Sequence, residues 1–241
     1  MTIDTWTIIR KEWKEFIVQR GSLRGNTLSL IIIIGILGIL PPLKAGSGWI
    51  VSPGVLILAV WGPFLLVSSV VPDSFAGERE RHTLETLLAT RLSDRAILFG
   101  KIFAAIGYGW GLTLIILLIG LVTVNLSSDS NSLLLYPVTI SIAILMLSLL
   151  GAWLAAGVGV LISLRVPTVR HAHQVLTAVG MLLLLIPIII ALTLPKDLLG
   201  QFAKFNANKM AIIVIAVLIG LNIVLSIAAT IRFKRPQLML D

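Results

Sequence analysis

Six long apolar segments take up most of this chain of 241 residues, and they constrain its fold more than any other feature. The segments are residues 27–43, 53–72, 97–126, 136–164, 175–194 and 210–231. A helix needs about 20 predominantly apolar residues to cross a bilayer, with a working range of about 17–25. All backbone polar groups must be satisfied within lipid, and these segments are too long to be the strands of a barrel. The sequence therefore predicts an all-α integral membrane protein with six transmembrane helices.

Prolines fall in or at the end of several of these segments. Pro41 and Pro42 are expected to close the first segment, which is short. Pro63 lies within the second segment and Pro187 interrupts the fifth.

The composition agrees with a membrane protein. Only 12% of the residues are charged and 57% are hydrophobic, whereas soluble domains carry about 25% charged residues. The chain has no cysteine, which rules out disulfides, thiolate metal ligands and cysteine nucleophiles. The apolar segments leave no room for a separate globular domain, so residues 1–241 are expected to form a single transmembrane domain.

The basic residues indicate the orientation of the chain. Of the 19 Lys and Arg residues, 15 fall on one side of the predicted topology and 4 on the other. The four are Lys44, Lys196, Lys204 and Lys209. Because Lys and Arg are enriched in cytoplasmic loops, both termini and the loop after the second span are expected in the cytoplasm, with the protein in the inner (cytoplasmic) membrane. The net charge of +8 is thus a topology signal, and no nucleic-acid partner is expected.

The first 25 residues form an amphipathic segment. Trp6, Trp13 and Phe16 recur at helical spacing, and basic residues lie on the other faces. A basic amphipathic helix with tryptophan on its apolar side lies in the membrane interface. Two interpretations stay open: a topology anchor, or an elbow helix that transmits motion from a cytoplasmic partner. A second short amphipathic helix is expected on the outer face at residues 195–209.

The sequence lacks the patterns of several chemical activities. No acidic residue falls in the middle of a predicted span, which argues against transport driven by protons or sodium ions. There is no GxxxxGK[ST] phosphate loop and no GxSxG or HExxH motif. His171 and His173 do not share a helix face, because residues two apart point in different directions. We therefore expect no catalytic residue, no metal site and no cofactor.

Small residues recur at packing distances in two of the spans. They are Gly100, Ala104, Gly107 and Gly111 in the third span, and Gly151, Ala155 and Gly159 in the fourth. Such stripes let helix backbones approach closely, either within one subunit or between two copies. In the last span, Asn222 is expected to hydrogen-bond to a neighbouring helix.

The cytoplasmic loop of residues 73–96 carries the densest pattern of charges. Alternating charges come first, and a leucine stripe follows at helical spacing. This order predicts an exposed polar knob on an apolar base, as a docking element requires; the alternative is an ordinary charged helix lying on the membrane. Ser93 is placed to cap the next helix, with Asp94 in its first turn.

This loop resembles the signature of the type-two ABC exporter permeases. The matching stretch is Glu78-Arg79-Glu80-Arg81-His82-Thr83-Leu84-Glu85-Thr86-Leu87-Leu88-Ala89-Thr90, followed by Leu92-Ser93 and Gly100-Lys101. The family typically reads E-R-E-x-G-T-L-E-x-L-L-x-T-P-L-S before Gly-Lys. His82 replaces the usual glycine and Arg91 the usual proline, which weakens the match only slightly. The resemblance extends over the whole order of elements along the chain.

The resemblance implies a permease that carries no ATPase of its own. Two permeases, here expected as a homodimer in the lipid bilayer, would bind two separate ATPase subunits. A cytoplasmic coupling helix between spans two and three would seat in a cleft of each ATPase. The residues that carry over to coupling are Glu78, Arg79, Glu80, Arg81, Thr83, Leu84 and Glu85.

Two alternatives to an ATP-driven exporter stay open. One is a permease-like subunit of a membrane assembly system, such as haem export for cytochrome assembly. The other is a polytopic membrane enzyme that modifies lipid, although the absence of carboxylate and histidine clusters counts against it. The uncharged spans favour an apolar or amphipathic cargo, while Ser, Thr, Asn and Tyr side chains from two subunits could also line a path for polar cargo.

Overall fold

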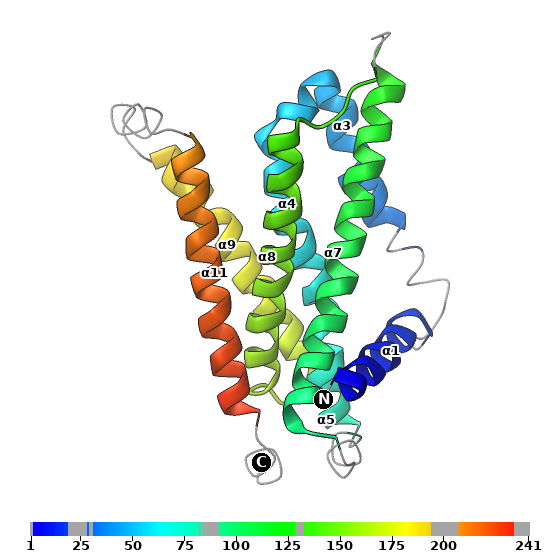
Figure 1. Cartoon of the computed structure of the whole chain (residues 1–241), viewed down its shortest axis with the longest axis vertical. Coiled ribbons are helices and arrows are strands. Elements are labelled where there is room, and N and C mark those ends of the chain that lie inside the picture. Colours follow the sequence, from blue (N-terminus) through cyan, green and yellow to red (C-terminus); the bar gives the residue numbers. More distant parts are fainter. Residues whose placement is uncertain are drawn as a thin grey trace.

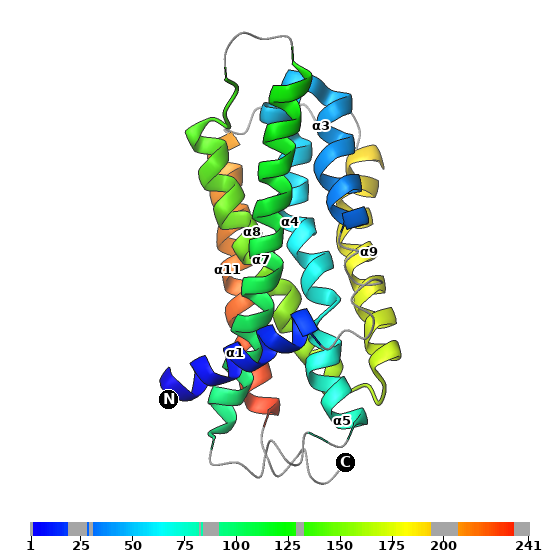
Figure 2. The same ribbon diagram turned by 90° about the vertical axis from the view of Figure 1, so that its right-hand side faces the viewer.

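The computed structural model describes residues 2–18, 28, 31–81, 83, 92–128, 133–193 and 207–233. Every regular element in this part of the chain is helical. The long helices are α4 (Pro53–Ser68), α7 (Asp94–Ser127), α8 (Val138–Ser163), α9 (Val169–Thr193) and α11 (Ala207–Arg232). They run side by side, as Figures 1 and 2 show. The prediction of an all-helical fold is confirmed for these residues.

One end of the molecule gathers several chain segments. The start of α1 (Thr2–Val18), the short helix α5 (Glu78–Glu80), the turn between α8 and α9 and the last turn of α11 all lie there (Figure 1). We call this the α5 end. The helix α3 (Leu40–Ala45) lies at the opposite end. Figure 2 shows that α1 crosses the long helices instead of running along them.

Five helices in the described part of the chain are long and apolar enough to cross a membrane. They are Ile31–Val51, Pro53–Glu80, Asp94–Ser127, Val138–Ser163 and Ile213–Arg232. The remaining long helix, α9, has 25 residues and contributes a shorter described apolar segment, Val169–Leu185. The structure thus supports a multi-pass membrane protein, and a sixth span stays a prediction. The outer helix expected at 195–209 falls largely outside the described residues.

The first span does not end at its prolines, contrary to the expectation from the sequence. A π-helical segment, η1 (Gly35–Ile39), leads directly into α3, and Pro41 and Pro42 occupy the first turn of that helix. Proline is tolerated in a first turn because the backbone N–H groups there need no partner within the helix. A 3-10 helix, η2 (Gly46–Val51), then completes the segment.

The second span also continues past the proline at which we expected it to stop. After a turn at Ser69 and Val70, the chain re-enters helical geometry and forms the π-helical segment η3 (Asp73–Gly77), which runs into α5. Pro72 has helical backbone angles, φ −57° and ψ −42°. The first charged residues of the loop are therefore carried on the end of a membrane-spanning helix.

The small-residue stripes pack helices of one chain against each other. A Cβ added to Gly151 of α8 would lie 2.5 Å from the carbonyl oxygen of Val60 in α4. A Cβ added to Gly100 of α7 would lie 2.8 Å from Ile8 of α1. Only glycine permits these approaches, so α8 is matched to α4 and α7 to α1. Gly111 differs, because a Cβ there meets nothing within 4 Å.

Tryptophan side chains add a directional bond between four pairs of helices. The indole N–H groups donate from Trp13 to the Ala104 carbonyl, from Trp61 to the Gly180 carbonyl, from Trp110 to Ser148 Oγ and from Trp153 to Ser226 Oγ. Trp61, Trp110 and Trp153 are partly buried and Trp13 is exposed, and the polar atom of each ring keeps a partner. Asn222 of α11 likewise donates to the Leu150 carbonyl of α8 at 3.2 Å, which confirms the expected contact with a neighbouring helix.

Candidate functional site

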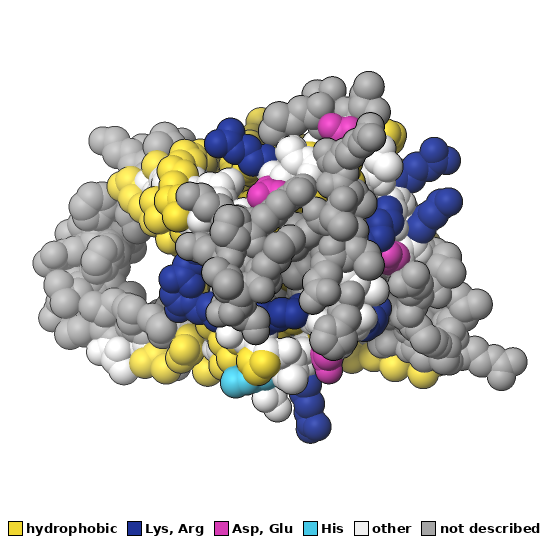
Figure 3. All heavy atoms as spheres, turned by 90° about the horizontal axis from the view of Figure 1, so that it is seen from below, with side chains coloured by type: hydrophobic (Ala, Val, Ile, Leu, Met, Phe, Trp, Pro, Cys, Tyr) yellow, Lys and Arg dark blue, Asp and Glu magenta, His cyan; other side chains and the backbone are white. Residues whose placement is uncertain are grey.

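Four of the charged residues singled out in the sequence lie at the α5 end: Glu78, Arg79, Glu80 and Arg81. Figure 3 views this end along the helices, with Lys and Arg side chains spread across it and Asp and Glu side chains between them. Three consecutive charged residues, Glu78, Arg79 and Glu80, make up α5. Each of them reaches a different part of the chain. They are the starting point of the site.

Glu78 belongs to a buried cluster of charges. Its Oε1 atom lies 2.9 Å from Nζ of Lys101, whose side chain is fully buried. Lys101 Nζ also donates to Glu12 Oε1 of α1 and to the carbonyl oxygen of Ser74, both at 2.8 Å. An ammonium group has three donors, and these three acceptors satisfy all of them. The ring of Phe75 lies 5.5 Å from the same ammonium group, within cation–π range. Lys101 therefore joins α1, α7 and the end of the second span.

Lys11 closes this cluster on its solvent side. Its Nζ lies 2.9 Å from Glu78 Oε1 and 3.3 Å from Glu15 Oε1. Burial by itself would lower the pKa of Lys11, but the hydrogen bond and charge of Glu78, with the charges of Glu12 and Glu15, raise that pKa above its usual value of 10.5. The ion pairs of Lys11 therefore stabilise the folded state fully below pH 10.5. This stabilisation is lost only as the pH rises through the raised pKa of Lys11.

The carboxylates of the cluster also have the grouping of a metal site. One oxygen from each of Glu12, Glu15 and Glu78 lies within 4.8 Å of the others. However, Nζ of Lys101 and of Lys11 already sit 2.9 Å from the same Glu78 oxygen. Two ammonium groups bound among three carboxylates balance most of their charge. The cluster is therefore a set of ion pairs that joins α1, α5 and α7.

Arg79 turns in another direction and binds the end of α8. Its guanidinium donates to the carbonyl oxygens of Leu164 at 3.3 Å and Ser163 at 3.1 Å, and also to that of Val166. The last carbonyl groups of a helix have no partner within the helix. The planar guanidinium, with five N–H donors, can satisfy several of them at once. Arg79 thus fixes α5 to the turn that follows α8.

The remaining coupling candidates that the structure describes are Glu80, Arg81 and Thr83. Glu80 Oε2 accepts a hydrogen bond from the backbone N–H of Val169 at 3.2 Å, at the start of α9. Thr83 Oγ1 donates to the Glu78 carbonyl, and Arg81 is exposed. Leu84 and Glu85 lie outside the described residues. The expected exposed knob is therefore wrong for Glu78, which is 7% exposed, because Lys101 draws it inward.

The elbow residues divide between two environments. Phe16 is buried, while Trp6 and Trp13 are 66% and 46% exposed. The face that packs on the protein repeats every four residues: Ile8, Glu12 and Phe16. The sequence pattern identified the helix but missed that its buried face contains an acid. An exposed tryptophan pair beside a buried face suits a helix at the membrane interface.

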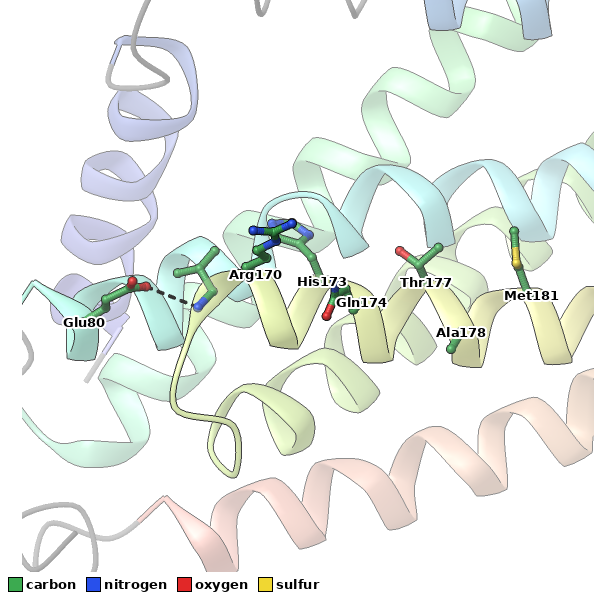
Figure 4. Close-up of a pocket in the computed structure, with 8 residues that line it drawn as sticks. Glu80, Arg170, His173, Gln174, Thr177, Ala178 and Met181 are labelled. Carbon is green, nitrogen blue, oxygen red and sulfur yellow. Dashed lines mark hydrogen bonds between the residues drawn. The ribbon is translucent and has the colours of Figure 1, made fainter.

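A hollow of about 790 Å³ runs along α9 next to α5. Figure 4 shows Glu80 at one end, followed by Arg170, His173, Thr177 and Met181 along the helix. A smaller cavity of about 230 Å³ lies deeper, between α4 and α9. It shares His173, Thr177 and Met181 with the hollow. The two form one mostly apolar recess with polar groups at its mouth.

Two members of this site, Glu12 and Lys101, were missed as functional residues in the sequence. Lys101 follows Gly100 inside a long apolar segment, and we counted it as a topology charge and as the end of the family signature, without a partner within the chain. A lysine several residues into a span usually pairs with an acid. That rule could have marked Lys101 as a paired lysine, and the four-residue repeat of Ile8, Glu12 and Phe16 could have marked Glu12 as facing the protein.

Comparison with known families agrees with this architecture. The family model described as ABC-2 type transporter matches residues 3–218. A search of curated proteins finds no match. The family match covers the crossing helix α1, the charged junction at α5 and the helices up to the middle of α11. The chain therefore belongs to the ABC-2 type transporter family, as a multi-pass permease subunit of an ABC transporter.

Proposed function

We propose that this permease exports its cargo with energy from a separate ATPase subunit, which acts on the α5 end. The observation that carries the proposal is the convergence at α5. Three successive charges there contact α1 and α7, the end of α8, and the start of α9. A displacement applied at this one point would reach four helices. Such a junction is what a subunit without its own ATPase needs.

The outward side of the junction is the proposed docking surface. Arg81 is exposed and directly follows α5. Thr83, Leu84 and Glu85, which continue the signature, are proposed to complete the contact. Charge-assisted hydrogen bonds at a protein interface are stronger than exposed ion pairs, so individual charges should matter here. The side chain of Glu78, which has ion-pair partners within the chain, is proposed to support this surface from behind.

The recess beside α9 suits an amphipathic cargo. Its wall of Leu176, Thr177 and Met181 is largely apolar, and Glu80, Arg170 and His173 stand at its mouth. Pockets of this kind use a few polar groups to orient a mainly apolar ligand. We propose that two copies of the chain form the complete path, each with its ATPase subunit, in the inner membrane with the α5 end in the cytoplasm.

The test is reconstitution of the permease with its ATPase subunit in liposomes. ATP added outside reaches only complexes whose α5 end faces outward, and an exporter then moves cargo into the lumen. ATP hydrolysis should be stimulated by some members of a panel of lipids, hydrophobic drugs and peptides. The proposal fails if no ATPase subunit co-purifies, or if a lipid is chemically changed in the absence of ATP, as a lipid-modifying enzyme would do.

Reversal of one charge tests the docking surface. We expect Arg81→Glu to weaken binding of the ATPase subunit and so to abolish stimulation of ATP hydrolysis, while the protein remains folded and inserted because the Arg81 side chain is exposed. Binding of the ATPase subunit to the immobilised permease is the measurement. Lys14→Glu, an exposed reversal on α1, is the control. If the wild type, Arg81→Glu and Lys14→Glu bind the ATPase subunit equally, Arg81 is not part of the docking surface.

A further inference from the structure

We infer that Arg79 and Glu80 are positioning residues, which clasp the α8–α9 turn and make α9 follow the movements of α5. The inference rests on the proposed function, in that an ATPase subunit must act on the α5 end. It assigns these two side chains to a contact within the permease instead of to the interface with the ATPase. The moving element is α9, which carries the recess.

The clasp holds the turn at both of its ends. Arg79 binds the carbonyl oxygens of Ser163 and Leu164, where α8 stops, and that of Val166 within the turn. Glu80 accepts from the N–H of Val169, where α9 starts. The carboxylate also faces the positive end of the α9 dipole. Two adjacent residues on a three-residue helix thus grip the terminus of one helix and the beginning of the next.

The packing of α9 allows this helix to tilt when α5 moves. Only a narrow stripe of the helix is buried against the rest of the described chain, at Ala172, Leu176 and Gly180, which are spaced four positions apart. Met181, Leu182, Leu183 and Leu185 are exposed. A helix held along one stripe loses little packing when it tilts, whereas one enclosed on all sides would resist.

The structure also supplies a pivot for this tilt. Gly180 approaches α4 so closely that an added Cβ would lie 2.7 Å from the ring of Phe64. Its carbonyl oxygen accepts from the indole N–H of Trp61 at 3.3 Å. Gly180 lies 11 residues from Val169, or about 16 Å along the helix at 1.5 Å per residue. A pull at the clasp would therefore change the width of the recess between the clasp and the pivot.

A reporter inside the recess can detect this movement without knowledge of the cargo. The chain has no cysteine, so Thr177→Cys introduces a single labelling site in the recess. In the reconstituted complex, we expect the rate of its reaction with a maleimide to differ between the nucleotide-free state and the state trapped with ATP and vanadate. Added to this reporter, Arg79→Ala should abolish the difference while the ATPase subunit stays bound and still hydrolyses ATP.

Matched variants separate the clasp from a general loss of charge. Arg165→Ala removes an exposed arginine from the same turn and should leave the nucleotide-dependent difference intact. Arg79→Lys should retain it only in part, because an ammonium group cannot reach three carbonyl groups as a guanidinium does. An unchanged difference in Arg79→Ala would overturn the inference, as would an equal loss in Arg165→Ala.

If ATP binding or subunit association fails in Arg79→Ala, the residue belongs to docking and the inference is wrong, while the proposed function stands. If wild type itself shows no ATPase partner, the proposed function fails first.

Discussion

Lys101 shows how much one buried charge can contribute to this fold. Its ammonium group binds one oxygen of Glu12, one oxygen of Glu78 and a backbone carbonyl at 2.8–2.9 Å. Lys101→Met would leave two carboxylates with too few partners in a site that excludes water. Breaking a buried ion pair by removing one partner costs about 3–5 kcal/mol. We therefore expect a large fall in the Tm of the purified protein in detergent.

The matched control for this prediction is Lys14→Met, the same substitution at an exposed position of α1. Neutralising the acids as well, with Glu12→Gln and Glu78→Gln in the Lys101→Met background, should recover part of the Tm. Equal Tm changes in Lys14→Met and Lys101→Met would show that the buried pairs do not hold α1 in place.

At the scale of residues, local contacts could be predicted and distant ones could not. Ser93 caps α7 by accepting from the N–H of Ala96 at 3.3 Å, because capping depends on residues three apart in the sequence. Lys101 and Glu12 are 89 residues apart, and so is the pair formed by Glu80 and Val169. No pattern along the chain specifies which of several acids a buried lysine meets. That choice is made when α1 packs across α7.

The glycine stripes give a prediction at the scale of elements. Gly151→Ala places a methyl group against the backbone of α4, where Val60 cannot withdraw without moving its helix. Overpacking of this kind costs about 1–3 kcal/mol, so the Tm should fall. Gly111→Ala is the control, because its Cβ meets nothing within 4 Å, and alanine favours a helix by up to about 1 kcal/mol. If Gly151→Ala and Gly111→Ala change the Tm by the same amount, the assigned packing of α8 on α4 is wrong.

The helices themselves follow from the sequence, while their ends and partners follow from packing. Apolar length predicted both ends of α7, α8 and α11 to within three residues, whereas α9 begins six residues before the expected start. The prediction that the first two spans end at their prolines was wrong. Pro41 and Pro42 lie in the first turn of α3, and Pro72 has helical backbone angles. The stripe on α7 allowed either a second copy or the same chain as its partner. The structure matches Gly100 to α1 and leaves Gly111 open, a distinction that no spacing in the sequence carries.

Orientation belongs to the whole molecule, and the charge bias predicts it. The α5 end carries α1, the α8–α9 turn and Arg232 of α11, while Lys44 lies in α3 at the other end. We expect Ser47→Cys, exposed in η2, to react in intact cells with a maleimide that cannot cross membranes. Arg165→Cys should react only after the membrane is opened.

A third position extends this experiment to the number of spans. Lys204→Cys, outside the described residues, should react in intact cells if α9 crosses the membrane as the sixth span, because an even number of crossings returns both ends of the chain to one side. Labelling at 204 only in opened membranes would leave five spans and separate the two termini. Since the clasp couples α5 to α9, it transmits motion across the bilayer only if α9 crosses it, so this result also decides how far the movement can reach.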